Sequence, residues 1–362
     1  SVIVTNTYFI EYTGRDRYTL PVLSITSDPE GLFSDSKGIL VPGTSSTPNY
    51  ERRGDDWERV ANIELYDTNN EKVVSSPVGI RVRGGGGRHS TQKSLTVNPR
   101  KRYGNSKIKN TFFDDTTAKK YGKFILRNGG QGPNHMGFDD FAGKLAMDNG
   151  LDSQHVKHVV TFIDGEYWGI YSMKETADAD YLEATYQAPK ENFAVLEINA
   201  KVVDGNNDDA QYFKSLVKYA QDNDLNDEKH YNYIKDRVDL ENLATYFILQ
   251  SYIANTDWPH NNIRYWRYRT ERPLPDAPEG LDGKWRWLLY DADCIFGSRY
   301  DSSAAQMNFS FNTLNNAINN NNLSSNLLKA LLKSKKFEEY FKLRLEDMVN
   351  ITLTEDRLLY RI

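Results

Sequence analysis

The segment Asn255-Thr256-Asp257-Trp258-Pro259-His260-Asn261-Asn262 lies between two strongly patterned stretches of the chain. Before it, residues 240–255 carry apolar side chains at helical spacing, which predicts a buried helix. After it, residues 263–268 read Ile-Arg-Tyr-Trp-Arg-Tyr, which predicts a strand. The segment is therefore expected to be an oxygen-rich loop between a long helix and a strand.

A second oxygen-rich motif follows. Residues 284–290 predict a strand that ends at Asp291-Ala292-Asp293, and residues 269–283, rich in Pro, read as an insertion between the two strands. Asp257 and Asn262 have the spacing at which protein kinases place the Asp that orients a hydroxyl and an Asn that holds a metal.

An amide oxygen is a suitable ligand for Mg²⁺, and an Asp at the end of a downstream strand is where a kinase holds its metal. The alternatives are an ordinary turn at residues 255–262, because Asn, Asp and Pro all favour turns, and a plain loop at Asp291-Ala292-Asp293.

Transfer of a phosphoryl group also needs cations near the phosphates. A glycine loop, residues 84–87, follows Arg83 and precedes Lys93, so Lys93 and Arg83 are candidates for phosphate contact, and Arg81 and Arg127 are further cations. The alternative is an ordinary glycine turn between strands. The loop matches neither a Walker A motif nor the Gly-x-Gly-x-x-Gly of dinucleotide sites.

Glu175 ends a predicted strand where the chain leaves the β-rich region, as a hinge beside an adenine would. The alternative is an exposed glutamate at a strand end. The predicted helix at residues 138–149 contains Asp139, Asp140 and Asp148 but no Glu to pair with Lys93, so the ordinary kinase pattern fails at this point.

Composition restricts the function classes. The chain has 362 residues, 39% of them hydrophobic and 26% charged, with a net charge of -5, which argues against general nucleic-acid binding. The single cysteine, Cys294, excludes an internal disulfide and is expected to pack in the interior. No apolar run approaches the roughly 18 residues of a membrane span. The 50 acidic residues leave a carboxylate pair for glycoside hydrolysis open.

The order of the expected elements predicts an α+β architecture. Residues 1–175 are expected to form a β-rich N-terminal lobe, with an N-terminal extension, one helix at residues 138–149 and a hairpin at residues 159–173 around Asp164-Gly165. Residues 176–362 are expected to form a mostly helical C-terminal lobe that carries the catalytic and metal loops. Ligands favour the cleft between such lobes.

Taken together, these motifs resemble the spore coat protein H (CotH) family of atypical kinases. They occur in the family's order over about residues 20–345. The blocks are Leu20-Pro21-Val22-Leu23-Ser24-Ile25, Gly38-Ile39-Leu40-Val41-Pro42-Gly43, Trp57-Glu58-Arg59, Gly79-Ile80-Arg81-Val82-Arg83-Gly84-Gly85, Gln92-Lys93-Ser94-Leu95, Tyr167-Trp168-Gly169-Ile170-Tyr171, Asn255-Thr256-Asp257-Trp258-Pro259 with Asn261-Asn262, and Trp285-Arg286-Trp287 with Tyr290-Asp291 and Asp293.

The resemblance implies a divergent, two-lobed protein-kinase-like fold and transfer of the γ-phosphate of ATP, with Mg²⁺, to Ser or Thr of secreted or surface proteins. It implies that Asp257 is the catalytic Asp, Asn262 and Asp291 are metal ligands with Asp293 as second ligand or support, and Lys93 contacts phosphate. Mn²⁺ or Ca²⁺ could replace Mg²⁺. Two departures from the family pattern, the run of four glycines at 84–87 and the insertion at 269–283, affect the nucleotide site.

The resemblance also implies an extracytoplasmic location, at the cell surface, in a spore coat or in a polysaccharide-degrading assembly such as a cellulosome. Two functions of other classes stay open. One is a catalytically silent scaffold that binds carbohydrate or protein in such an assembly, and the other is structural Ca²⁺ binding at the Asp-rich loops. The expected partners are a protein substrate, with no nucleic acid and no membrane span.

Overall fold

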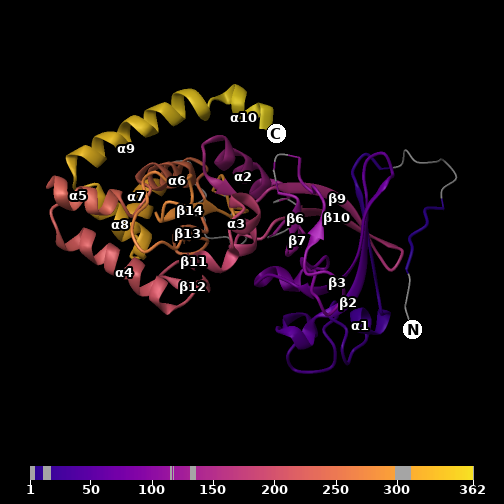
Figure 1. Cartoon of the computed structure of the whole chain (residues 1–362). Helices are drawn as coiled ribbons and strands as arrows, with labels where there is room; N and C mark the ends of the chain where they lie inside the picture. Colours follow the sequence, from indigo (N-terminus) through magenta and orange to yellow (C-terminus); the bar gives the residue numbers. More distant parts are fainter. Residues whose placement is uncertain are drawn as a thin grey trace. The chain divides into compact units, whose positions relative to one another are not determined.

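The computed structural model describes residues 5–10, 18–114, 116, 118–130, 136–297 and 311–361. The chain forms two compact units. The first comprises Ser1–Met136 and His155–Thr176, and the second comprises Gly137–Gln154 and Ala177–Ile362. The expected mixture of helices and strands is present, with ten α-helices in the described part of the chain (Figure 1).

The first unit is built on a closed barrel of seven strands. Neighbouring strands are antiparallel, except where β1 and β9 close the barrel in parallel, with Val22 opposite Val160. In barrel order the strands are β1 (Val22–Ser27), β2 (Arg59–Tyr66), β3 (Lys72–Val82), β4 (Leu95–Asn98), β7 (Phe124–Arg127), β10 (Glu166–Lys174) and β9 (Val156–Ile163). The unit also holds α1 (Pro29–Phe33) and the small pair β5 (Ile108–Lys109) and β6 (Lys120–Tyr121).

The predicted hairpin is confirmed. β9 and β10 pair antiparallel and are joined by Asp164-Gly165, both at positive φ (49° and 87°). Two successive residues at positive φ are what a tight hairpin turn requires, which explains the Asp-Gly signal.

The second unit surrounds a five-stranded sheet with helices (Figure 1). The sheet order is β12 (Lys201–Asp204), β11 (Phe193–Glu197), β13 (Arg264–Tyr268), β14 (Arg286–Leu289) and β8 (Asp152–Ser153). The helices are α2 (Phe138–Asp148), α3 (Ala179–Tyr186), α4 (Asn207–Asp222), α5 (Glu228–Lys235), α6 (Leu240–Tyr252), α7 (Thr313–Asn319), α8 (Leu323–Leu331), α9 (Lys335–Asp347) and α10 (Glu355–Arg361). Two strands of this sheet, β13 and β14, correspond to the strands expected at residues 263–268 and 284–290, whereas β8, β11 and β12 were not predicted.

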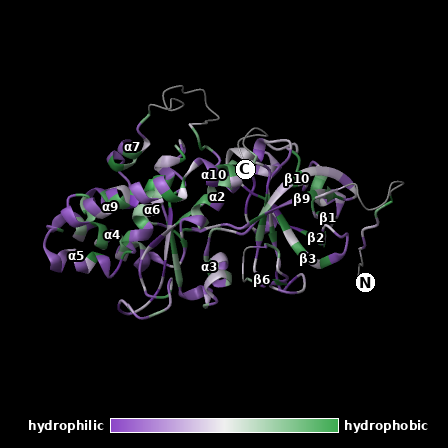
Figure 2. Cartoon of the chain, turned by 90° about the horizontal axis from the view of Figure 1, so that it is seen from above, coloured by the Kyte–Doolittle hydropathy of each residue, from purple (hydrophilic) through white to green (hydrophobic). Residues whose placement is uncertain are grey.

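The main core of the second unit lies between its helices and the sheet. α6 is buried along nearly its whole length, and its side chains pack with Trp285 and Trp287 from the sheet. The surface helices carry both hydrophilic and hydrophobic residues, as amphipathic helices do (Figure 2). Within the described residues, no helix is both long and apolar enough to cross a membrane.

Helix α2 packs differently from the expectation. Its existence and its Gly150 stop, at φ 76°, agree with the sequence pattern. Its apolar face, with Leu145 and Ala146, joins the core of the second unit, so residues 137–154 cluster there and not with residues 1–136.

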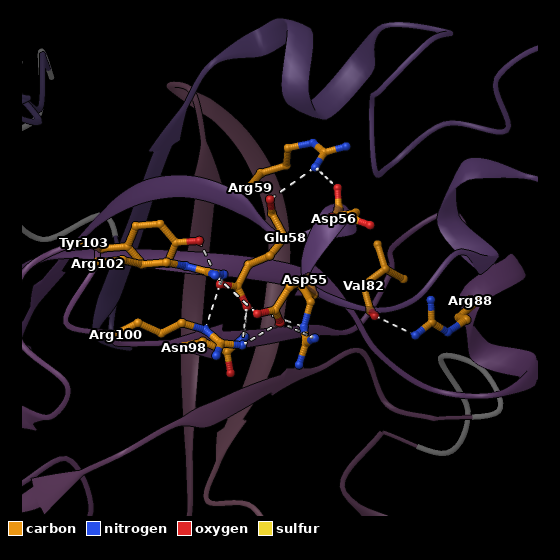
Figure 3. Close-up of polar contacts among 11 residues, drawn as sticks. Asp55, Asp56, Glu58, Arg59, Val82, Arg88, Asn98, Arg100, Arg102 and Tyr103 are labelled. Carbon is orange, nitrogen blue, oxygen red and sulfur yellow. Dashed lines mark hydrogen bonds and ion pairs between the residues drawn. The ribbon is translucent and has the colours of Figure 1, made fainter.

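The first unit contains a buried carboxylate held by arginines. The side chain of Glu58 is 0% exposed and accepts hydrogen bonds from Arg100 (2.9 Å), Arg102 (2.5 Å), Tyr103 (2.8 Å) and Asn98 (3.0 Å), as Figure 3 shows. We call these residues, together with Arg81 at 3.6 Å, the Glu58 cluster.

Gly79 on β3 makes room for the Glu58 cluster. A Cβ atom at Gly79 would lie 2.4 Å from Glu58 Oε1, far inside normal contact. The cluster therefore fixes the segment before β2 onto β3 and the turn after β4.

Candidate functional site

The loop at residues 255–262 is tied at several points to α6. Asn255 donates to the side chain of Gln250 (3.0 Å), and the indole of Trp258 donates to Tyr246 Oη (3.2 Å). Tyr246 in turn donates to the main-chain oxygen of Asn262 (3.4 Å). Buried polar side chains need such partners, and α6 supplies several of them, while Thr256 donates to Cys294 O and Pro259 O accepts from Asn322 Nδ2. The loop is therefore a fixed platform.

Strand register brings Asn262 to Asp291. β13 and β14 are antiparallel, with Tyr265 opposite Trp287, so the residue before β13 and the residue after β14 lie at the same end of the sheet. Asn262 Nδ2 donates to Asp291 O at 3.0 Å. Both residues have φ 54°, a left-handed conformation that Asn and Asp tolerate better than other side chains. The two motifs therefore contact each other within the second unit.

The Asp257 carboxylate is half-buried and receives hydrogen bonds on both oxygens. Asn262 Nδ2 donates to Oδ2 (3.1 Å), Asn261 Nδ2 donates to Oδ1 (3.2 Å), and His260 Nε2 lies 3.2 Å from Oδ1. Burial works against the charged form, but the hydrogen bonds from His260, Asn261 and Asn262 and the charge of His260 outweigh it and lower the pKa of Asp257. Asp257 is thus ionised near neutral pH, and its carboxylate can accept a hydrogen bond from a hydroxyl group and so orient that group.

The turn from Asp291 to Asp293 carries negatively charged side chains. Asp293 is 2% exposed, Asp291 is half-buried, and Cys294 beside them is buried as expected. Burial raises the pKa of the Cys294 thiol, and the negative charges of Asp293, Asp257 and Asp291 raise it further.

The oxygen atoms of Asn262, Asp291 and Asp293 suit Mg²⁺, which needs few protein ligands, better than an ion that is surrounded by protein ligands alone. In the described part of the chain, no three His, Cys, Asp or Glu residues are grouped so as to hold a metal ion. The amide nitrogen of Asn262 is engaged by Asp257 and Asp291 O, and its oxygen accepts no hydrogen bond from the described residues. Mg²⁺ commonly uses one or two carboxylates with water and substrate phosphates, whereas Ca²⁺ takes roughly six to eight oxygens.

The predicted cations lie in the first unit. Lys93 is 6% exposed, its Nζ donates to Ser90 O (2.9 Å) and lies 4.1 Å from the ring centre of Tyr50. Burial lowers the pKa of Lys93. Arg83 is half-buried and begins the glycine loop, and its main-chain N–H donates to Ser94 O (2.8 Å).

Glu175 also belongs to the first unit. It is 1% exposed, so the alternative of an exposed strand-end glutamate is wrong. Its Oε2 accepts from the His155 main-chain N–H (3.1 Å) and lies 2.7 Å from His155 Nδ1. The hinge role of Glu175 stays a prediction.

Sequence reasoning missed Asp139 as a partner of the second motif. Its Oδ1 accepts from the main-chain N–H of Ala292 at 2.8 Å, which pins the turn between Asp291 and Asp293 to α2. The two residues are 153 positions apart in the chain, and no local pattern connects them.

Replacing Asp139 by Ala is expected to destabilise the protein by about 1–3 kcal/mol, because it leaves the buried Ala292 N–H without its acceptor. The measurement is urea unfolding. The control is Asp148→Ala on the same helix, whose carboxylate pairs with Arg361 near the surface and should matter less. Equal losses in the two variants would contradict this role of Asp139.

Comparison with known proteins assigns the chain to a family. No curated protein is similar enough to the chain to count as a match. The family model described as CotH kinase protein matches residues 80–362, which include Asp257, Asn262, Asp291 and Asp293. That match covers most of the sequence, and the chain belongs to the CotH kinase family.

Proposed function

We propose that the chain is a kinase of the CotH type that transfers the γ-phosphate of Mg-ATP to Ser or Thr hydroxyls of secreted or surface proteins. The observation that carries the proposal is the junction of two motifs: Asn262 Nδ2 donates both to Asp257 Oδ2 and to Asp291 O. Family membership supports a kinase-like activity. A divergent, two-lobed kinase-like arrangement of the two units is part of the same proposal.

Each residue near this junction has a role that its contacts suit. Asp257 accepts the hydrogen bond of the substrate hydroxyl and so orients it. Its lowered pKa makes it a weak base, so orientation is the larger part of its contribution. Asn262 through its amide oxygen and Asp291 through its carboxylate would hold Mg²⁺, with Asp293 as support. The ion supplies charge neutralisation at the transferred phosphate.

The remaining roles rest on the sequence pattern and, for Lys93, also on the family resemblance. We propose that Lys93 and Arg83 contact the nucleotide phosphates, and that Glu175 marks the hinge beside the adenine. An extracytoplasmic location, in a coat or a polysaccharide-degrading assembly, belongs to the same proposal.

Incorporation of labelled γ-phosphate into a Ser-rich acceptor protein tests the function. Wild type is expected to label the acceptor with Mg²⁺ or Mn²⁺, and Asp291→Ala is expected to abolish the labelling. Asp276→Asn, an exposed carboxylate in the insertion, is the matched control and should behave as wild type. If wild type labels neither itself nor the acceptor with either ion, the silent scaffold becomes the better hypothesis.

The pKa of Asp257 predicts the acid side of the pH profile. Because the folded-state pKa lies below the ordinary value of 3.8, the carboxylate stays charged at every pH above that value. Protonation of Asp257 should therefore not limit kcat/KM between pH 5 and 8, and its effect should begin only below about pH 4. The profile of initial rates at saturating Mg²⁺ checks this. A fall with a midpoint near pH 6 that persists in His260→Ala would contradict it.

A further inference from the structure

A cavity lies in the second unit, at the other end of β13 from Asn262. Its volume is about 560 Å³, and Arg267 and Arg269 line it, roughly 16 Å and 23 Å along the chain from Asn262 at ~3.3 Å per residue. The start of α4, the end of α5 and the first residues of the insertion form the other walls. The insertion at residues 269–283 therefore forms one wall of this cavity.

The cavity contains more cationic than anionic groups. Arg237, Arg267, Arg269 and Arg272 line it, together with three acids, Asp208, Asp209 and Glu271. Asp209 is already engaged, because both its oxygens accept from Arg269 at 2.8 Å. Three guanidinium groups then face two exposed carboxylates.

The guanidinium of Arg267 is mostly buried but only partly paired within the protein. Its side chain is 12% exposed, its Nε is buried without a hydrogen-bond partner, and its nearest carboxylate oxygen, on Asp209, is 3.8 Å away. Its Cζ atom lies over the rings of Tyr212 (4.3 Å to the ring centre) and Trp285 (5.5 Å). Burial of a charge that has one distant ion pair and an Nε without a hydrogen-bond partner is costly, so an anion in the cavity would relieve that cost.

Arg237 is held in the same manner on the α5 side. Its guanidinium lies 3.8 Å from the ring centre of Tyr233, and Nη1 donates to Tyr233 O (3.0 Å). Two arginines that are already fixed on aromatic rings lose little side-chain freedom when they bind, and a fork of N–H donors matches phosphate oxygens.

We propose that this cavity binds a phosphate monoester carried by a protein segment, as on phosphoserine. Phosphate suits the site better than a single carboxylate because it brings two charges and three acceptor oxygens to several guanidinium groups. The volume exceeds the needs of a phosphate ion alone, since pockets for larger ligands begin near ~300 Å³. The proposal concerns binding and does not rest on the proposed phosphotransfer.

Calorimetric titration of the full chain, without nucleotide and at low salt, tests the site. The probes are a short phosphoserine peptide, the same peptide with Ser, the same peptide with Glu, and inorganic phosphate. We expect saturable binding of the phosphoserine peptide and none of the Ser peptide. Arg237→Gln and Arg267→Gln should each weaken binding about tenfold or more, because each removes charged hydrogen-bond donors.

Two variants outside the cavity serve as controls that binding occurs at the cavity and not elsewhere. Lys218→Gln removes an exposed cation from α4, and Asp291→Ala changes the candidate active site, so both should bind the phosphopeptide as wild type does. Melting temperatures show whether Arg267→Gln is folded, and Arg237, which is half-buried, provides an independent variant.

Three results would overturn the proposal. The first is that the phosphopeptide shows no saturable binding below about 1 mM. The second is that wild type, Arg237→Gln and Arg267→Gln bind it with equal affinity. The third is that inorganic phosphate binds but the phosphopeptide does not. The last would exclude a protein segment as the source of the phosphate. Because Asp291→Ala separates the two sites, failure here leaves the kinase proposal untouched.

Discussion

Replacing Asp257 by Asn is expected to reduce phosphotransfer by about 10²–10⁴-fold, the range that a positioned acid–base group contributes. The substitution keeps the size of the side chain but removes the charge that Asn261, Asn262 and His260 stabilise. The loop is anchored to α6 through Tyr246 and is expected to stay folded. The rate constant of γ-phosphate transfer at saturating nucleotide is the quantity to measure.

His260→Ala provides a graded comparison. His260 touches the same carboxylate, at 3.2 Å, but its side chain is 49% exposed, so solvent can replace it. Its loss should cost less than about tenfold in rate, as expected for one exposed charged contact. If Asp257→Asn kept more than a tenth of the wild-type rate, Asp257 would not be the group that orients the hydroxyl.

The parts of the site that depend on local sequence pattern could be predicted. The five-residue spacing of Asp257 and Asn262 and the strand before Asp291 are local, and antiparallel pairing of the two flanking strands then brings the motifs together. The Asp164-Gly165 hairpin was predicted for the same reason.

Features that depend on distant contacts could not be predicted. Asp139 meets Ala292 across 153 residues, and β8 pairs in parallel with β14 although it has only two residues. The assignment of α2 to the second unit also depends on packing, since its apolar spacing is the same whichever core it joins. Amphipathic spacing shows which face is buried but not against what.

The structure also shows what two of the sequence blocks behind the family resemblance do in the fold. Trp57-Glu58-Arg59 places a carboxylate in the interior, and Gly79-Ile80-Arg81 supplies the space and one of the cations that it needs. The family match begins at residue 80, so it includes Arg81, Arg100 and Arg102 but not Glu58. These blocks stabilise the first unit, and their presence says nothing direct about catalysis.

Replacing Glu58 by Gln is expected to lower the free energy of unfolding by about 3 kcal/mol, the lower end for a broken buried ion pair. The value lies at the lower end because Arg81, Arg100 and Arg102 are partly exposed and can regain water. Gln has nearly the same volume as Glu, so no cavity adds to the effect. Urea unfolding followed by circular dichroism gives the value.

Asp55→Asn is a matched control because Asp55 contacts the same three arginines, of which Figure 3 labels Arg100 and Arg102. Its side chain is 55% exposed, so its loss should cost only ~0–1 kcal/mol. The two variants thus remove one charge each from one set of arginines, and they differ mainly in burial. Similar losses in both would show that burial does not decide the strength of this network.

The effect of Glu58→Gln should also depend on pH in a definite direction. Burial opposes ionisation, but hydrogen bonds from Arg100, Tyr103 and Arg102 outweigh it and hold the pKa of Glu58 below its usual value of 4.5. A group with a lowered folded-state pKa contributes its stability above the unfolded pKa and loses it as the pH falls through the folded pKa. The difference between wild type and Glu58→Gln should therefore be full at pH 7 and shrink below about pH 4. A difference that stayed constant down to pH 3 would mean that the contribution of Glu58 comes from its shape and not from its charge.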